Sequence, residues 1–308
     1  MPTGINVLAG FVIVTLIWAT TPLAIKWSGE GPGFLFGVTA RMVLGALVLV
    51  MIAYIKRVRL PMHRQAVVTY LAAGAGIYGA MLSTYWGAQY IQSGFISVVF
   101  GLTPIVTGLL AYFILSERSL NGFKVIGIVF GMAGLVVIFW RSMRLSDGVV
   151  YGISAICVAV TIHALSSVLV KRWHGDLPVL SVTTGGMLVA LPIYLLTWAL
   201  LDGQWPASIP DAALWSIIYL AVIATTVGFN MYYFLLKHMP ASQVALLTLV
   251  TPVIALLIGH IFNDEVIGPR AWIGTICILF GMSLYQWGSL WLQRLRSRAQ
   301  VVSEEPEA

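Results

Sequence analysis

The sequence predicts an all-α integral membrane protein, with ten transmembrane helices arranged as two inverted five-helix repeats. Three observations lead to this prediction. Of the 308 residues, 59% are hydrophobic and only 9% are charged, whereas soluble domains carry about 25% charged residues. The apolar residues gather in long runs, and motifs of the first half return in the same order in the second. Lipid must therefore be the solvent for most of the chain.

Each apolar run holds about the 20 residues that a helix needs to cross the hydrocarbon core. Glycine, proline or charged residues separate neighbouring runs, and the connectors are too short for a soluble domain. The first run is too long for the apolar region of a secretory signal, and no Lys or Arg precedes it. We expect spans at 5–26, 33–55, 66–88, 93–116, 122–140, 148–170, 178–200, 213–236, 242–262 and 270–292.

Lys and Arg are distributed unevenly between the connectors. If the N-terminus lies in the cytoplasm, 12 of the 17 basic residues fall on the inner side, four on the outer side and one, Arg41, within a span. We expect an inner-membrane protein, and the positive-inside rule then predicts that both termini lie in the cytoplasm. These residues also explain the net charge of +6, so we expect no nucleic acid partner. Residues 293–308 are polar and predict a disordered cytoplasmic tail.

Residues 5–140 form the first repeat and residues 148–292 the second. Shifts of 145 to 148 residues align equivalent positions of the two halves. The aligned pairs are Thr103-Pro104 with Thr251-Pro252, Gly127 with Gly274, Gly134 with Gly281, Tyr85 with Tyr233, and Lys26 with Lys171. Because each half has an odd number of helices, the second half enters the membrane from the opposite side. Such inverted repeats are typical of alternating-access transporters, whose substrate site lies where the halves meet.

Several motifs accompany this architecture. They are Trp18-Ala19 followed by Lys26, Arg41, Pro104 with Glu117, and Pro252 with Glu265. Over residues 5–292 the chain resembles the EamA family of the drug/metabolite transporter superfamily. The resemblance implies a secondary transporter that exports an amino acid or a similar amphipathic metabolite. It also implies a central cavity lined by the first, third, fourth, sixth, eighth and ninth helices.

The two halves differ at two positions of this pattern. The second half has His163 where the first has Trp18, and Gly186 where the first has Arg41, so no family role carries over to His163 or Gly186. A histidine within a span is a functional candidate, or a neutral residue bonded to a neighbouring helix. Trp18, deep in its span, offers a stacking surface for substrate or plain packing. Arg41 can contact a substrate anion or hold carbonyl groups between helices, and the second role is favoured.

Polar and aromatic residues recur on matching faces of the third and eighth spans. Thr226, Asn230 and Tyr233 share one helical face by their spacing. The repeat maps Thr226 onto Tyr78 and Tyr233 onto Tyr85. We expect these five residues to converge with Trp18 and His163 on one cavity that binds substrate, although polar contacts between helices would give the same pattern.

Two prolines fall in the middle of predicted spans. Pro104 and Pro252 interrupt the helical hydrogen bonds there, and we expect them to act in gating or to shape a static bundle. Glu117 and Glu265 stand at span ends, where a capping role is favoured over proton binding.

Other functions find little support. Common intramembrane protease signatures and a Walker loop are missing, so we expect no enzyme. No metal site or cofactor is expected, because both cysteines lie in apolar runs and read as small hydrophobes. A cationic drug exporter and a non-transporting scaffold or receptor remain alternatives. The expected partners are the bilayer and a small-molecule substrate, with the chain a monomer or a homodimer.

Overall fold

The computed structural model describes residues 4–115, 122–145, 147–245 and 247–303, and every element in them is a helix. All ten predicted spans correspond to helical segments, and the fourth, eighth and ninth are each divided into shorter elements. In chain order the elements are α1 (Gly4–Gly29), α2 (Phe34–Ile55), α3 (Arg64–Gly87), α4 (Ser93–Phe100), α5 (Thr103–Ile114), α6 (Gly122–Leu145), α7 (Asp147–Trp173), α8 (Val179–Leu201), α9 (Asp211–Tyr219), the π-helix η1 (Leu220–Gly228), α10 (Phe229–His238), α11 (Ala241–Val244), α12 (Leu247–Asn263) and α13 (Pro269–Ser303).

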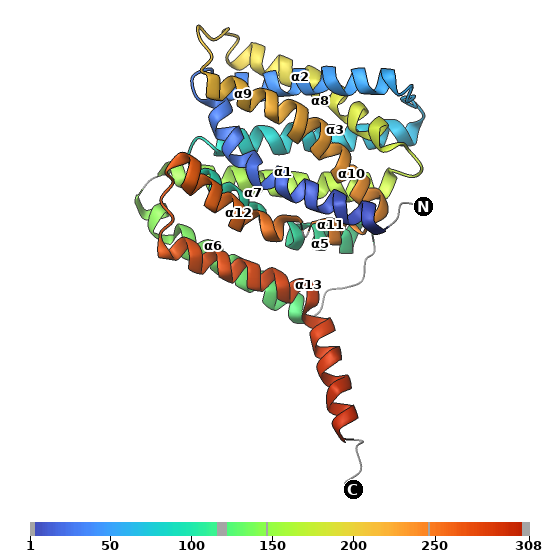
Figure 1. The fold of residues 1–308 in the computed structure, drawn as a ribbon, viewed down its shortest axis with the longest axis vertical. Coiled ribbons are helices and arrows are strands. Elements are labelled where there is room, and N and C mark those ends of the chain that lie inside the picture. Colours follow the sequence, from blue (N-terminus) through green and yellow to red (C-terminus); the bar gives the residue numbers. More distant parts are fainter. Residues whose placement is uncertain (1–3, 116–121, 146, 246, 304–308) are drawn as a thin grey trace.

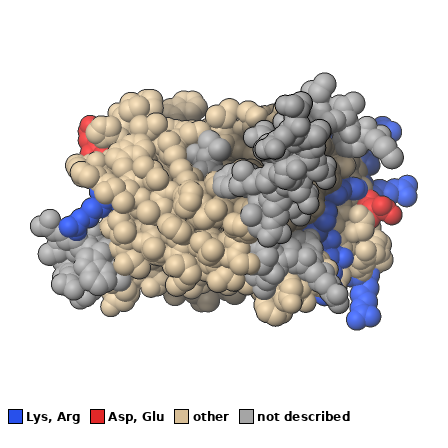
Figure 2. Space-filling model, turned by 90° about the horizontal axis from the view of Figure 1, so that it is seen from below, with Lys and Arg blue, Asp and Glu red and all other residues tan. Residues whose placement is uncertain are grey.

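The helices form a multi-pass membrane bundle. Among the described residues, seven helical segments are long and apolar enough to cross a bilayer, and Gly122–Ile138 and Thr251–Asn263 are shorter apolar helices. The helices lie side by side (Figure 1), and on the face seen in Figure 2 the visible charged side chains lie at the two ends of a broad uncharged band. We call the end where α1 begins the terminal end. It carries most described basic residues: Lys56, Arg57, Arg59, Arg64, Lys124, Lys171, Arg172 and Lys237.

The contacts between helices show the inverted repeat. The eighth span packs on α1 as α3 packs on α7, and α12 packs on α1 as α4 and α5 pack on α7. Likewise, α2 packs on η1 as α8 packs on α3, and α4 packs on α12 as α11 packs on α5, while the equivalent helices α6 and α13 pack on each other. Most of the larger contacts are therefore matched by a counterpart when the two five-helix halves are exchanged.

Helices α6 and α13 form an outer layer (Figure 1) and meet through reciprocal glycines. A Cβ on Gly127 would lie 2.4 Å from the Gly281 carbonyl oxygen, and a Cβ on Gly274 would lie 2.5 Å from the Gly134 carbonyl oxygen. The repeat exchanges these two contacts, because Gly127 aligns with Gly274 and Gly134 with Gly281. Small residues thus let the backbones of the two equivalent helices touch.

The predicted disordered tail covers residues 293–308. The backbone of residues 293–303 continues α13 to Ser303, and this last part projects away from the bundle (Figure 1). Extending an existing helix needs no new nucleus, and Arg, Gln, Leu and Ala are good helix formers. Residues 304–308 lie outside the described residues.

The fourth and ninth spans are broken rather than kinked at their prolines. Helix α4 ends at Phe100 and α5 starts at Thr103, so Pro104 sits in the first turn of α5 instead of mid-helix. Its missing N–H would be unpaired there in any case. Pro252 does lie inside α12, as expected, although α12 itself starts only at Leu247 after the short helix α11. The two prolines therefore occupy different helical positions in a symmetric pair of broken spans.

Candidate functional site

A cavity of about 70 Å³ lies between the two halves, near the middle of the bundle. It is lined by the six spans expected from the family resemblance, and also by α2, which contributes Arg41. Its space is large enough for several water molecules. The lining residues are Trp18, Thr21, Pro22, Ile25, Arg41, Met81, Thr84, Ile96, Ser97, Phe100, His163, Ala224, Phe229, Thr248 and Thr251.

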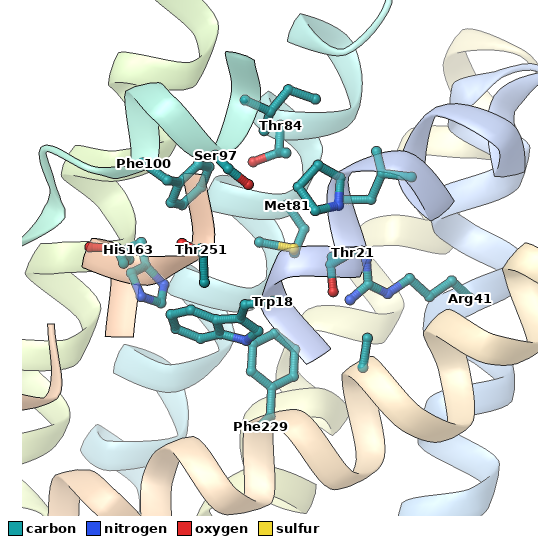
Figure 3. Close-up of a pocket in the computed structure, with 15 residues that line it drawn as sticks. Trp18, Thr21, Arg41, Met81, Thr84, Ser97, Phe100, His163, Phe229 and Thr251 are labelled. Carbon is teal, nitrogen blue, oxygen red and sulfur yellow. The ribbon is translucent and has the colours of Figure 1, made fainter. Parts of the chain in front are cut away.

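One side of the cavity is an aromatic wall (Figure 3). The Trp18 and His163 rings meet edge to face at 5.5 Å, and Phe100 lies 6.2 Å from the His163 ring. Tyr232 packs behind them, 5.0 Å from Trp18 and 5.2 Å from His163, and its hydroxyl is hydrogen-bonded to Ser167. The repeat therefore brings Trp18 and His163 together across the two halves, and Tyr232 fixes both rings.

Arg41 lies at the other side of the cavity and is 2% exposed (Figure 3). Its Nε donates a hydrogen bond to Thr225 Oγ1 at 2.9 Å, and its guanidinium carbon lies 6.0 Å from the centre of the Tyr85 ring. Its Nη1 is buried and has no hydrogen-bond partner among the described residues. Since arginine stays charged in proteins, the cavity holds a fixed cation with unused hydrogen-bonding capacity.

The π-helix η1 decides which residues of the eighth span reach this site. A π-helix turns more slowly than an α-helix, and such segments are frequent at functional sites. The span lines the cavity with Ala224 and Phe229, five residues apart, while Thr225 faces Arg41. Thr226 instead donates to the Ala221 carbonyl, five residues back. A prediction from α-helical spacing selects Thr226 and misses Thr225 for this reason.

The other predicted binding residues do not line the cavity. Tyr78 is hydrogen-bonded to Thr197 between α3 and α8, at 2.8 Å. Asn230 bonds the Thr226 carbonyl and accepts from Thr183 of α8 at 3.2 Å. Tyr233 is 3% exposed and stacks on Phe229. Of the seven residues expected to converge on one cavity, Trp18 and His163 line it. The other five pack between helices outside its lining.

Tyr85 has a supporting position. It is buried beside Arg41, and its hydroxyl lies 3.4 Å from the Ser28 hydroxyl of α1, which donates to it. A tyrosine face beside a guanidinium is a favourable cation–π arrangement. Tyr85 therefore helps to hold the Arg41 side chain, without itself facing the cavity.

Pro22 was not singled out by the sequence reasoning, although it lies within a span, as Pro104, Pro192 and Pro252 do. It lies inside α1 and lines the cavity beside Thr21. Because proline has no N–H, the Trp18 carbonyl four residues earlier loses its helical donor. The sequence did contain a signal for the Pro22 side of the cavity: a proline within a span, one helical turn after Trp18.

The end of the bundle opposite the terminal end carries a hydrogen-bond network around Glu265, which is 5% exposed. Its two carboxylate oxygens accept from the backbone N–H groups of Ser93 and Gly94 at 2.8 and 3.2 Å, which caps the start of α4. Asn263 donates to the same carboxylate and accepts from the Trp27 indole of α1. Glu265 thus has the expected capping role, and it links both halves. Glu117 lies outside the described residues.

The two aligned lysines make equivalent contacts at opposite ends of the bundle. Lys26 of α1 donates to the Ile91 carbonyl, between α3 and α4, at 3.4 Å. Lys171 of α7 donates to the Leu236 and Met239 carbonyls, at the end of α10, at 2.7 and 2.9 Å. Each lysine therefore binds carbonyl groups at or just after the end of the third helix of its own repeat, which is α3 for Lys26 and the eighth span for Lys171.

These features define a class of protein: a polytopic membrane protein built from two inverted repeats around a central cavity with polar and aromatic lining. The profile of the EamA-like transporter family matches residues 6–140 and again 150–286. The chain belongs to this family and is a membrane transporter. Its partners are accordingly the lipid bilayer and a small-molecule substrate.

Several relatives cover most of the chain. The uncharacterised transporter YoaV of Bacillus subtilis is 26% identical over 90% of this chain and 96% of its own. A probable terminal-alkyne amino-acid exporter of Streptantibioticus cattleyicolor is 26% identical over 89% and 91%, and a probable amino-acid metabolite efflux pump of Escherichia coli is 24% identical over 67% and 71%. A solved crystal structure superposes with a TM-score of 0.69 at 20% identity, over 92% of this chain and 98% of that one, which shows the shared fold.

Residues suited to hold a metal do not gather in the described part of the chain, where no three His, Cys, Asp or Glu side chains come together. Cys157 and Cys277 are free and half-buried. Among the described residues that line the cavity, none is Asp or Glu. The chemistry available there is therefore binding by one cation, hydroxyl groups and aromatic rings.

Proposed function

We propose that the protein exports a small amphipathic metabolite, such as an amino acid, across the bacterial inner membrane by alternating access. The observation that carries this proposal is the cavity between the two repeats, whose lining combines the buried Arg41 with an aromatic wall. Such a lining suits a molecule with one polar and one apolar part. Two relatives are named as exporters of amino acids or their metabolites, which supports the outward direction.

In this mechanism the two halves rock about the cavity and expose it to each side in turn. The contacts of Glu265 and Lys26 close one end, and those of Lys171 help to close the terminal end. Breaking one set while keeping the other opens the cavity to one side only. The broken spans α4–α5 and α11–α12 lie at the cavity and give each half a point at which to bend. Gating by Pro104 and Pro252 belongs to this proposal.

The membrane orientation is part of the same proposal. The excess of basic residues at the terminal end supports a cytoplasmic position for that end and for both chain termini. The cavity is built from residues of one chain, so a monomer suffices for transport and a homodimer is not required. With no described carboxylate at the cavity, downhill transport or exchange is favoured over proton drive through a buried acid.

A cationic drug exporter is the second candidate, because aromatic rings bind cations face-on. Arg41 opposes it, since a fixed positive charge in a low-dielectric cavity repels a cationic substrate. The experiment that tests the proposal is counterflow of radiolabelled amino acids and quaternary amines in proteoliposomes. We expect accumulation of an amino acid or related metabolite. Accumulation of amines alone would favour the drug exporter, and no flux of any solute would favour a scaffold or receptor.

A further inference from the structure

We infer that the cavity recognises the carboxylate of its substrate through Arg41 and has no site that requires an ammonium group, so that simple amphipathic organic acids are bound. This inference rests on the proposed transport function and names the substrate class of the same site. It makes the anionic group, rather than the amino group of an amino acid, the feature that selects the substrate.

The charge balance of the cavity is the first step of the argument. Arg41 is buried in the membrane interior, and no described acidic side chain forms an ion pair with it or lines the cavity. A buried charge is costly unless an opposite charge or several hydrogen bonds compensate it. The Thr225 hydroxyl and the Tyr85 ring compensate it only in part. A bound anion supplies the missing counter-charge.

The geometry of Arg41 is the second step. Its Nε is engaged by Thr225, which fixes the plane of the guanidinium group, while its buried Nη1 remains without a described partner. A carboxylate accepts well-directed hydrogen bonds from such a planar group. Figure 3 shows the Arg41 side chain reaching towards the cavity from α2, next to Thr21. The Arg41 end of the cavity is therefore prepared for an oxyanion.

The opposite wall is the third step. Trp18, Phe100, His163 and Phe229 present rings to the cavity, and Ile25, Met81 and Ile96 add apolar surface. An apolar group of the substrate lies against these side chains and gains the free energy of leaving water. An ammonium group would find hydroxyl groups such as Thr251 but no described carboxylate. A branched or aromatic monocarboxylate thus satisfies both ends of the cavity.

The test measures binding of matched ligands to the purified full-length protein by thermal shift and by competition. The probes are propionate, 3-methylbutanoate, 3-phenylpropionate, phenylalanine and phenethylamine. We expect 3-phenylpropionate and phenylalanine to bind with similar affinity, propionate more weakly, and phenethylamine at least about tenfold more weakly than 3-phenylpropionate. Arg41→Gln should lower acid affinity roughly ten- to a hundredfold, and Arg41→Lys should retain part of it.

The control is Lys237→Gln, which removes a positive charge outside the cavity, where Lys237 donates to the Leu177 carbonyl. It should leave acid binding unchanged. If Arg41→Gln fails to fold, Thr225→Val, which only releases the guanidinium group, should still weaken the acids more than phenethylamine. Equal binding of amine and acid, unchanged acid binding in the Arg41 variants, or no binding of any acid would overturn the inference.

Transport assays separate this inference from the proposed function. Acid binding that depends on Arg41, without flux of any solute, would leave the inference standing and refute the transporter. Flux of amines or neutral solutes that is insensitive to Arg41→Gln would leave the transporter standing and refute the carboxylate site.

Discussion

The two repeats share one helical framework but place different chemistry at its centre. Their outer features match: Lys26 and Lys171 bind equivalent carbonyl groups, and both the fourth and the ninth span are broken. At the cavity, by contrast, Trp18 faces His163, and Arg41 has Gly186 as its counterpart. Symmetric positions therefore maintain the architecture, while the diverged positions Trp18, His163 and Arg41 line the cavity.

The counterpart of Arg41 shows why the second half has no buried cation. A Cβ on Gly186 would lie 2.7 Å from the Ala73 Cβ and 3.3 Å from the Gly74 nitrogen of α3. Helices α8 and α3 are thus in backbone contact at a point where α2 and η1 leave room for a guanidinium group. One copy of the repeat uses this position for packing, and the other uses it for the site.

The comparison of the two repeats assumes that the second repeat is inverted in the membrane. Reporter fusions test this inversion with an all-or-none result. Fusions after Lys56 and after Arg298 should report the cytoplasm, and a fusion near Gly203 should report the periplasm, because positive residues stay inside. Paired alkaline phosphatase and fluorescent protein activities measure this. A periplasmic C-terminus would contradict both the charge rule and the odd number of helices in each repeat.

Packing at Gly186 gives the largest expected effect on stability. Gly186→Ala should lower the free energy of unfolding by about 1–3 kcal/mol, because the added methyl group forces α8 away from α3. Thermal denaturation in detergent measures the loss. Gly122→Ala is the matched control: nothing lies within 4 Å of its added Cβ, so it should be neutral or slightly stabilising. A Gly186→Ala protein as stable as wild type would show that the two helices can separate freely.

The Glu265 network should give a smaller effect. Glu265→Gln keeps one acceptor but loses the charge that caps α4, so stability should fall by about 1–2 kcal/mol. If this network also closes one end of the cavity, counterflow should change as well. Glu30→Gln, at an exposed acidic residue in a connector of the same end, is the control and should match wild type in both assays. Equal behaviour of the two variants would remove Glu265 from the proposed closure.

The prolines should give the smallest effect on stability and separate the two broken spans. Pro252→Ala restores a hydrogen bond inside α12, so stability should hold or rise and transport should slow. Pro104→Ala acts in the first turn of α5, where no bond is gained, so its stability change should be smaller. Unfolding temperatures and counterflow rates measure both. Unchanged transport in both variants would leave the prolines as elements of shape only.

Part of the site could be predicted from the sequence, and the reason for each miss is local. Trp18 and His163 were identified because a polar or large aromatic residue deep in a span stands out against its apolar neighbours. Thr225 was missed because the π-helix η1 changes which residues share a helical face. A run of apolar residues carries no sequence signal that predicts a π-helix. Tyr78 and Asn230 were assigned to the cavity because polar contacts between helices produce the same pattern as a binding surface.

The sequence by itself determined that the chain lies in a lipid bilayer, that it has ten helical segments and that these form an inverted repeat. These follow from the length of the apolar runs, the distribution of Lys and Arg, and the parity of the repeat, all of which act along the chain. Only the tertiary structure decided which side chains meet at the cavity. That choice depends on contacts between residues far apart in the sequence, such as Arg41 with Thr225 and Trp18 with His163. It also depends on the π-helix η1, which changes the residues of the eighth span that face the cavity.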